Sequence, residues 1–433
     1  MEHPFSLDLH TIEVADVRFG PETRIDGGTL IVDAAAIETL LLEDPRIAGV
    51  EVDIARPGES VRIVHCLDAV EPRAKVTGDG GVFPGFVGPM RQAGTGETVR
   101  LAGVAVLTSS HFPQPASGLM QAREGVVDMS GSAAPYSPFS RVTNLVLVPT
   151  PNPETSNEDY DDAIRRGALR VAEHLARACA GATRSSTTTF TTGTRHPDLP
   201  RVVYFLQLQG QAPMSDTFLY GHVIHNLVPT PILPGEIMDG AIVNGVYVYA
   251  CYKNPTYLHQ NNPIIWDLQR RHGVDLDFAG VIINRGHNYT HEEKERSSLW
   301  AAKLARTMGA DGAILTGEGG GNSAIDMMLA CQYMEQAGIE TVVLSSEATG
   351  EDGYDFPLFY SVPEADAIVS VGSHDGFVAM PEVERVVGDE FLKEDGVLLA
   401  AGVPARGPFD LRMYYQYCGI NQLGANVITG RAF

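Results

Sequence analysis

The strongest constraint on the fold lies between residues 275 and 375, where short apolar runs alternate with stretches of helical spacing. The runs are DFAGVIIN, DGAILT, ETVVLSS and ADAIVSVG, and the helical stretches are EEKERSSLWAAKLARTMG and SAIDMMLACQYMEQAG. Strands that are apolar at nearly every position are typical of a parallel sheet that is covered on both faces by crossover helices. The region therefore predicts a Rossmann-like α/β domain with a parallel sheet.

The residues before this region follow a different pattern. Residues 1–150 contain short β-branched or alternating runs that are separated by glycine and proline, and they predict an N-terminal β-rich domain. Residues 158–180 have helical spacing, whereas residues 181–197 are rich in Ser and Thr and predict an exposed linker or a mobile loop. The expected fold class is thus α/β: the β-rich domain, a helix and linker over 151–199, and the α/β domain over 200–433.

Composition excludes several classes of function. The net charge is −23 with no basic face or tail, which argues against nucleic acid and anionic membranes as partners. No apolar run approaches the ~20 residues of a membrane-spanning helix, and the first residues show no signal-peptide pattern, so a cytoplasmic protein is expected. The five cysteines are widely spaced without C-x-x-C, and no H-x-x-x-H pair encloses a Glu, so neither disulfides nor a metal site are expected.

The predicted sheet also indicates where a ligand would bind. Ligands of such sheets bind beyond the carboxyl ends of the strands, which here are Asn284, Gly317–Asn322, Ser345–Glu347 and Gly372–Asp375. The glycine-rich stretch TGEGGGNS lies between a strand and a helix, where backbone N–H groups can hold an anion. It is neither a dinucleotide fingerprint nor a Walker A loop, and a turn with a Ser or Asn cap explains it equally well.

One cysteine stands in an unusual setting. The apolar, β-like run Ala241–Ala250 ends abruptly at Cys251, and a cluster of Asn, Gln and His follows. The chain has 26 Arg but only five Lys, and Lys253 stands two residues from this thiol, where an ammonium group lowers a thiol pKa and favours the thiolate. A cysteine at the end of an apolar strand is, however, more commonly a small buried hydrophobe. The residues alone leave both interpretations open.

A set of motifs in fixed order extends along nearly the whole chain. The motifs are EVDIARPGESVRI, EPRAKVTGDGGVFPG, GVVDMSGSAAPYSPFS, SDTFLYG, EIMDGAIVNG, ACYKNPTY, HQNNP, EKERSSLWAAKLA and TGEGGGN. In this set the chain resembles the precursor of component B of the glycine/sarcosine/betaine reductases, a relative of the D-proline reductase precursor. The resemblance implies a cut between Ala250 and Cys251 that turns Cys251 into a pyruvoyl group, the cofactor. Where the family usually has an acidic residue after the cysteine, this chain has Tyr252.

The resemblance also implies an activity and partners. The chain would be an oxidoreductase component in which the pyruvoyl carbonyl binds a small amino acid as a Schiff base. A selenocysteine on a separate component B subunit would then displace the amine, and the component A selenoprotein and the thioredoxin system would complete the reaction to acetyl phosphate. An oligomer is expected. The alternatives are a D-proline reductase-like component and an unprocessed paralogue that binds a small carboxylate.

The resemblance directs attention to specific residues. By position, Lys253, Asn254 and Thr256 are candidates for polarising the Ala250 carbonyl. The substrate carboxylate calls for the bidentate fork of an arginine, and the candidates are Arg56, Arg62, Arg285 and Arg296. The expected substrate-binding set is Gly319, Gly320, Asn322 and Arg296.

Overall fold

The computed structural model describes residues 5–114, 125–191, 194–211, 216–245, 249–350, 358–392 and 403–426. Over these ranges the chain is a mixed α/β protein in which three larger sheets carry most of the strands. Among the helices of these ranges, none is long and apolar enough to cross a membrane.

A parallel sheet lies in the second half of the chain. Its strand order is β16 (Thr230–Ile232), β18 (Asp277–Gly286), β13 (Arg201–Gln209), β19 (Gly312–Gly317), β20 (Glu340–Glu347) and β21 (Ile368–Ser373). All neighbours pair in parallel except β16, which joins β18 antiparallel. In the sheet, β18 lies on one side of β13, and β19, the next strand along the chain, lies on the other side of β13. The strand order therefore reverses between β13 and β19, the place where open α/β sheets bind ligands.

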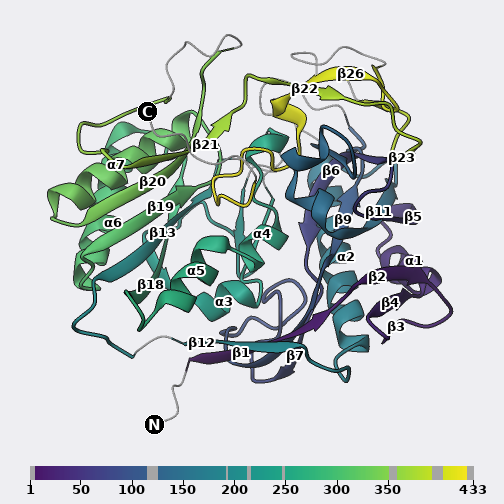
Figure 1. Ribbon diagram of the computed structural model, residues 1–433, viewed down its shortest axis with the longest axis horizontal. Coiled ribbons are helices and arrows are strands. Elements are labelled where there is room, and N and C mark those ends of the chain that lie inside the picture. Colours follow the sequence, from purple (N-terminus) through teal and green to yellow (C-terminus); the bar gives the residue numbers. More distant parts are fainter. Residues whose placement is uncertain are drawn as a thin grey trace.

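The two faces of this sheet pack against different partners. Helices α6 (His291–Thr307) and α7 (Asn322–Gln336) cover one face, as Figure 1 shows, and share a hydrophobic core with Val203 and Phe205 of β13. The alternate residues of β13, Tyr204 and Leu206, belong to a different core. This alternation follows from the two-residue period of a strand and explains why β13 is apolar at every position from Val202 to Leu206.

A second sheet is built mainly from the first third of the chain. Its strand order is β10 (Gly125–Asp128), β6 (Val61–Val70), β9 (Val104–Ser109), β11 (Thr143–Pro151) and β5 (Ile47–Ala55). Every residue of β6 is buried. A strand from far along the chain, β23 (Arg385–Val387), pairs in parallel with β6. The helix α2 (Asn157–Ala178) lies within two residues of its predicted bounds and packs its apolar side chains against this sheet.

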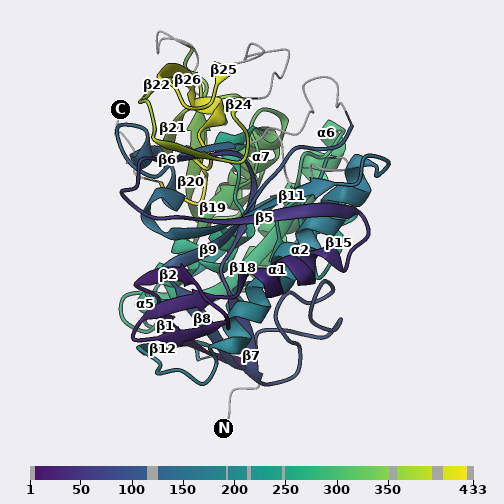
Figure 2. The ribbon, with the colours of Figure 1, turned by 90° about the vertical axis from the view of Figure 1, so that its right-hand side faces the viewer.

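The third sheet corrects one prediction. Its order is β12 (Ser186–Thr191), β1 (Ser6–Glu13), β8 (Gly96–Ala102) and β7 (Arg73–Thr77), and Figure 2 shows these strands together. The Ser/Thr-rich segment 181–197 was expected to be a linker or loop, but residues 186–191 form the antiparallel edge strand beside β1. Threonine is β-branched and suits an edge strand with one exposed side, and Phe190 anchors the strand in the core. Residues 192–193 lie outside the described residues.

The remaining elements are short. They include α1 (Ala34–Leu42), α3 (Pro234–Met238), α4 (Thr256–Gln260), α5 (Pro263–Arg271), β2 (Asp16–Phe19), β3 (Arg24–Asp26), β4 (Thr29–Val32), β14 (Phe218–Leu219), β15 (His222–Val223), β17 (Ile242–Val243), β22 (Phe377–Met380), β24 (Phe391–Leu392), β25 (Val403–Pro404), β26 (Phe409–Arg412) and the 3₁₀ turns η3 (Ala250–Tyr252) and η4 (Met413–Tyr415). The apolar run Ala241–Ala250 was expected to be a strand up to the cysteine. Only β17 is strand there, and residues 246–248 lie outside the described residues.

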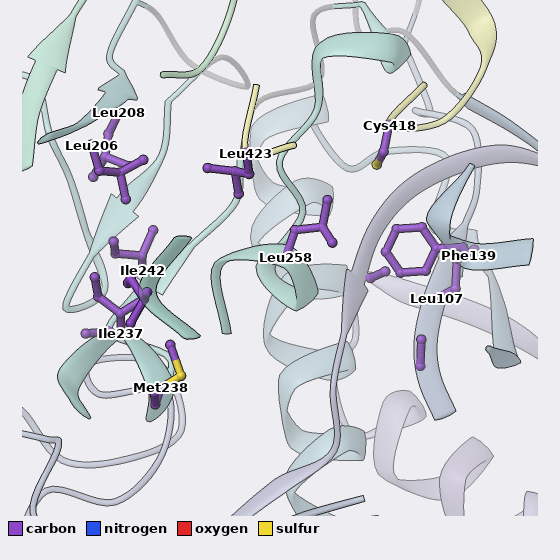
Figure 3. Packing of buried hydrophobic residues seen from close by; sticks show 14 of the residues in the cluster. Leu107, Phe139, Leu206, Leu208, Ile237, Met238, Ile242, Leu258, Cys418 and Leu423 are labelled. Carbon is purple, nitrogen blue, oxygen red and sulfur yellow. The ribbon is translucent and has the colours of Figure 1, made fainter. Parts of the chain in front are cut away.

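One hydrophobic core joins the two larger sheets. It includes Leu107 of β9, Leu206 of β13, and Leu258 of α4, together with Cys418 near the end of the chain. In Figure 3, Leu258 lies between Leu206 on one side and Phe139 and Leu107 on the other. The short helix α4, which begins five residues after Cys251, is therefore wedged between the two halves of the molecule.

Candidate active site

Cys251 lies in the middle of a buried 3₁₀ turn, η3. Its side chain has no exposed surface, and Ala250 before it is equally buried. The residue that precedes the turn, Tyr249, has a φ of 35°. A positive φ is strained for a residue with a bulky side chain and persists only where the surroundings enforce it. The backbone is therefore held under strain one residue before Ala250.

Backbone donors converge on the carbonyl groups of this turn. The Ala250 carbonyl accepts the N–H of Cys418 at 2.9 Å and the N–H of Lys253 at 3.4 Å. The next carbonyl, that of Cys251, accepts the N–H of Ile420 at 3.1 Å. Two N–H groups aimed at one carbonyl oxygen are the arrangement that stabilises negative charge on that oxygen during attack at the carbonyl carbon.

The side chains after Cys251 anchor the turn between the two sheets. The Asn254 amide donates to the Gly317 carbonyl at 3.1 Å, at the end of β19. The Thr256 hydroxyl and N–H donate to the Asp68 carboxylate of β6 at 2.7 and 3.0 Å. The Lys253 ammonium lies 3.4 Å from the Cys66 carbonyl, also on β6. Of the three residues predicted to polarise the Ala250 carbonyl, Lys253 reaches it through its backbone N–H, and Asn254 and Thr256 bind elsewhere with their side chains.

The pKa of the Cys251 thiol differs from the expectation. Burial raises the pKa of Cys251 well above its usual value, and the nearby Asp375 raises it further. The ammonium of Lys253 was expected to lower this pKa, but it points to β6, where it lowers the pKa of Cys66 against the larger effect of burial. Cys251 is therefore a thiol at neutral pH, because desolvation opposes the thiolate.

A chain of hydrogen bonds leads from the turn to solvent. The Tyr252 hydroxyl shares a hydrogen bond with Nδ1 of His374, and Nε2 of His374 lies 3.1 Å from Oδ1 of Asp375. Tyr252 and His374 are buried, whereas the Asp375 side chain is 17% exposed. Burial lowers the pKa of His374, against the opposing effect of Asp375. The imidazole is thus neutral at pH 7 and able to accept a proton.

A second cluster of buried polar residues lies at the point where the strand order reverses. Glu318, the acid of the TGEGGGN stretch, accepts the Gln209 N–H at 2.7 Å and lies 2.8 Å from Nε2 of His259. All three residues are buried. Within the described residues, Gln209 Oε1, His259 Nδ1 and Asn254 Oδ1 have no hydrogen-bond partner. Buried polar atoms are normally paired, so these three atoms are available to hydrogen-bond further polar groups.

The glycine-rich stretch lies against the turn. A Cβ at Gly320 would lie 3.2 Å from the Tyr252 ring, and the Gly319 carbonyl accepts the Gln422 amide. Asn322 begins α7, and its carbonyl accepts the Lys294 ammonium at 3.3 Å. The predicted ligand region therefore meets Tyr252, the residue after the predicted cysteine, at Gly320.

The candidate arginines have other partners. Arg62 is fully buried and holds Asp128 with two hydrogen bonds, and Arg56 holds Asp16 and Glu59. Arg285 donates to the carbonyls of Gly210 and His225. Arg296 is exposed on α6, with its guanidinium 5.7 Å from the centre of the Trp300 ring. These described contacts do not bring Arg296 to the turn.

Three relevant residues were not singled out from the sequence. They are His259, which pairs with Glu318, His374, which pairs with Tyr252 of the turn, and Cys418, which donates to the Ala250 carbonyl. His259 stands within the HQNNP motif and His374 within the predicted carboxyl edge Gly372–Asp375, so both carried a signal. Cys418 contributes a backbone N–H, at a φ of 63°, and a backbone donor leaves no trace in the residue type.

Comparison with known proteins decides the family. The family model described as glycine/sarcosine/betaine reductase component B subunits matches residues 5–421. The chain belongs to this family. It is 35% identical to the glycine reductase complex component B subunits alpha and beta of Acetoanaerobium sticklandii, over 99% of this chain and the full length of the relative. No solved structure matches the chain.

Two further relatives place the chain within the family. It is 38% identical to the sarcosine reductase complex component B subunit alpha of Peptoclostridium acidaminophilum, over 88% of this chain and 89% of the relative. It is 22% identical to the D-proline reductase proprotein of Acetoanaerobium sticklandii, over 78% of this chain but only 54% of that protein. The relatives named as components of reductase complexes support an oxidoreductase-type role for this chain.

Proposed function

We propose that this chain is the precursor of a pyruvoyl-dependent component B of an amino-acid reductase, and that it is cut between Ala250 and Cys251. The observation that carries the proposal is the Ala250 carbonyl, which two backbone N–H groups hold in a buried turn directly before the cysteine. The strained φ of Tyr249, one residue before Ala250, supports it, because strain beside a scissile bond can be relieved when the bond breaks.

The cut follows from the chemistry of a thiol beside a polarised carbonyl. Sγ of Cys251 loses its proton and bonds to the Ala250 carbonyl carbon, while the bond from that carbon to the Cys251 nitrogen breaks and the nitrogen takes up a proton. Removal of the Cys251 α-proton then breaks the Cβ–Sγ bond, and the sulfur leaves on Ala250 as a thiocarboxylate. Water replaces the nitrogen of the remaining enamine after tautomerisation, which releases ammonia and leaves a ketone.

The first step needs a group that accepts the thiol proton. In this proposal the acceptor is the hydrogen-bonded chain Tyr252–His374–Asp375, which begins at the residue after Cys251 and ends at a partly exposed carboxylate. His374 is neutral at pH 7, as an acceptor must be. The N–H groups of Cys418 and Lys253 stabilise the negative charge that develops on the Ala250 oxygen.

The pyruvoyl group would supply a ketone that condenses with the amine of the substrate and withdraws electrons from it. A primary or secondary amine suits this chemistry, because a quaternary amine has no N–H to lose. The buried polar atoms of Gln209, Asn254 and His259 lie beside the turn and could bind the polar groups of a small amino acid. The separate selenocysteine-containing subunit, the component A selenoprotein and thioredoxin are the proposed partners, in the cytoplasm.

Intact-mass analysis of the purified protein tests the proposal. We expect two chains, with the second beginning at position 251 and reacting with a carbonyl reagent such as a hydrazide. Cys251→Ala should give a single intact chain, and Cys331→Ala, which removes another buried thiol, should be cut like the wild type. A wild-type chain that stays intact under all folding conditions would contradict the proposal and favour an unprocessed carboxylate-binding paralogue.

The length of the match favours the glycine type over the D-proline type. The chain matches glycine and sarcosine reductase components over most or all of their length, but only about half of the D-proline reductase proprotein. We therefore propose the glycine/sarcosine/betaine type, and turnover of glycine or sarcosine but not proline in the reconstituted complex is the expected result.

A further inference from the structure

Two histidines and an aspartate from distant parts of the chain meet at one edge of the second sheet. His65 belongs to β6, His111 follows β9, and Asp389 precedes β24. One possible ligand atom from each side chain lies within 4.8 Å of the others. The two imidazole rings are 3.8 Å apart between their centres, and Nε2 of His111 is 2.8 Å from Oδ2 of Asp389.

The backbone is distorted in a way that creates this cluster. His65 has a φ of 60° in the interior of β6, and the register of β6 against β10 and β9 shifts near this point. Gly388 has a φ of 107°, and a Cβ there would lie 2.7 Å from the Ser109 hydroxyl, so only glycine lets the chain approach β9 closely enough to place Asp389. Strain of this kind accumulates at functional sites.

We propose that His65, His111 and Asp389 bind one divalent transition-metal ion of the Zn²⁺ type. Two neutral imidazoles and one carboxylate are a donor set that such ions prefer, and three protein ligands leave a further position for water. The side chains of His111 and Asp389 are 35% and 42% exposed, which gives an ion access from solvent. His65 is buried and would fix the ion to the sheet.

The position of the ligands suggests what the ion does. His65 and His111 precede the Ala250–Cys251 bond and Asp389 follows it, so an ion bound by all three would link the two chains that the proposed cut produces. This consequence rests on the proposed function, whereas the metal site itself does not. The two can therefore fail separately, and binding is best measured on the intact Cys251→Ala chain as well as on the wild type.

The test is metal binding by untagged, full-length protein. After removal of metal with a chelator, calorimetric titration with Zn²⁺ and elemental analysis should show one ion per chain. We expect His111→Ala and Asp389→Asn each to weaken Zn²⁺ binding at least about tenfold. Glu390→Gln removes an exposed carboxylate next to Asp389 and should bind like the wild type, as should His222→Ala, which removes an exposed histidine of β15.

Other outcomes overturn the proposal. A wild-type chain that binds less than one Zn²⁺ ion does so, and so does an affinity that neither His111→Ala nor Asp389→Asn reduces. Circular dichroism and the unfolding midpoint of each metal-free variant should match those of the metal-free wild type, which shows that lost binding is not lost folding. In a second readout, Co²⁺ should give a visible absorption band in the wild type that Asp389→Asn weakens.

Discussion

The two ends of the parallel sheet differ in how open they are to solvent and in how deeply their polar groups are buried. At the amino ends of the strands a cavity of about 650 Å³ opens to solvent, lined by Pro200, Gly312 and Glu340 among others. At the carboxyl ends, the turn with Cys251 fills the point where the strand order reverses, and Glu318 and His259 are fully buried there. The proposed cleavage of the precursor would take place at the buried end, and it needs no open cavity because both reacting groups belong to the chain itself.

The largest predicted effect tests the proton acceptor at the carboxyl end. His374→Gln should slow chain cleavage roughly 100-fold, because it removes the proposed acceptor of the thiol proton. The pKa of His374 is lowered below its ordinary 6.5, so the neutral form is present above that pH and is lost as the pH falls through the lowered value. Wild-type cleavage, followed by mass spectrometry, should therefore decline in acid, and the variant should lose this dependence.

The matched control lies at the other end of the sheet. Glu340→Gln, in the amino-end cavity, should leave the rate of cleavage and its pH profile unchanged. If His374→Gln cleaves at the wild-type rate with the same decline in acid, the role assigned to the Tyr252–His374–Asp375 chain is wrong.

The next effect concerns the stability that buried pairing provides. His259→Leu removes the partner of the buried Glu318 carboxylate and should lower the free energy of unfolding by about 3 kcal/mol. At the amino end, Arg271→Ala removes an exposed partner of Asp275 and should cause no measurable change. Urea unfolding of both variants measures the difference, and equal effects would contradict the contrast between the two ends.

The smallest predicted effect concerns two glycines at opposite ends of β19: Gly312 begins the strand and Gly319 follows it. Gly319 has a φ of 77°, and a Cβ there would collide with Oε1 of Gln209, so Gly319→Ala should cost about 1–2 kcal/mol. Gly312 has only the Glu340 carbonyl 3.5 Å from its Cβ position, so Gly312→Ala should change stability by less than about 0.5 kcal/mol. Thermal unfolding should rank the two, and a larger loss for Gly312→Ala would refute the reasoning.

Much of the second half of the molecule could be predicted from local pattern. The strands β18, β19, β20 and β21 and the helices α6 and α7 coincide with the expected segments, because buried strands and amphipathic helices impose different apolar periods. The position of the ligand region at the carboxyl ends followed from the same pattern. Tyr252 indeed meets this edge at Gly320 and His374.

Contacts between residues that are far apart in the sequence could not be predicted from it. Ser186–Thr191 is a strand because it pairs with β1, a strand far away in the sequence. The polarity of the segment indicated only that it would be exposed. Lys253 stands two residues from Cys251 in the sequence, yet its ammonium reaches β6. The expected absence of a metal site rested on close spacing of ligands, and the cluster of His65, His111 and Asp389 has no such spacing.

The sequence by itself determined the family, the parallel sheet and the cysteine at position 251, since motif order and apolar period are properties of neighbouring residues. Only the tertiary structure decided which groups surround that cysteine. It buried the thiol and raised its pKa, brought the Cys418 N–H to the Ala250 carbonyl, and placed His374 beside Tyr252. These contacts join residues more than 100 positions apart, and such distances in the chain are closed only by the packing of a shared core.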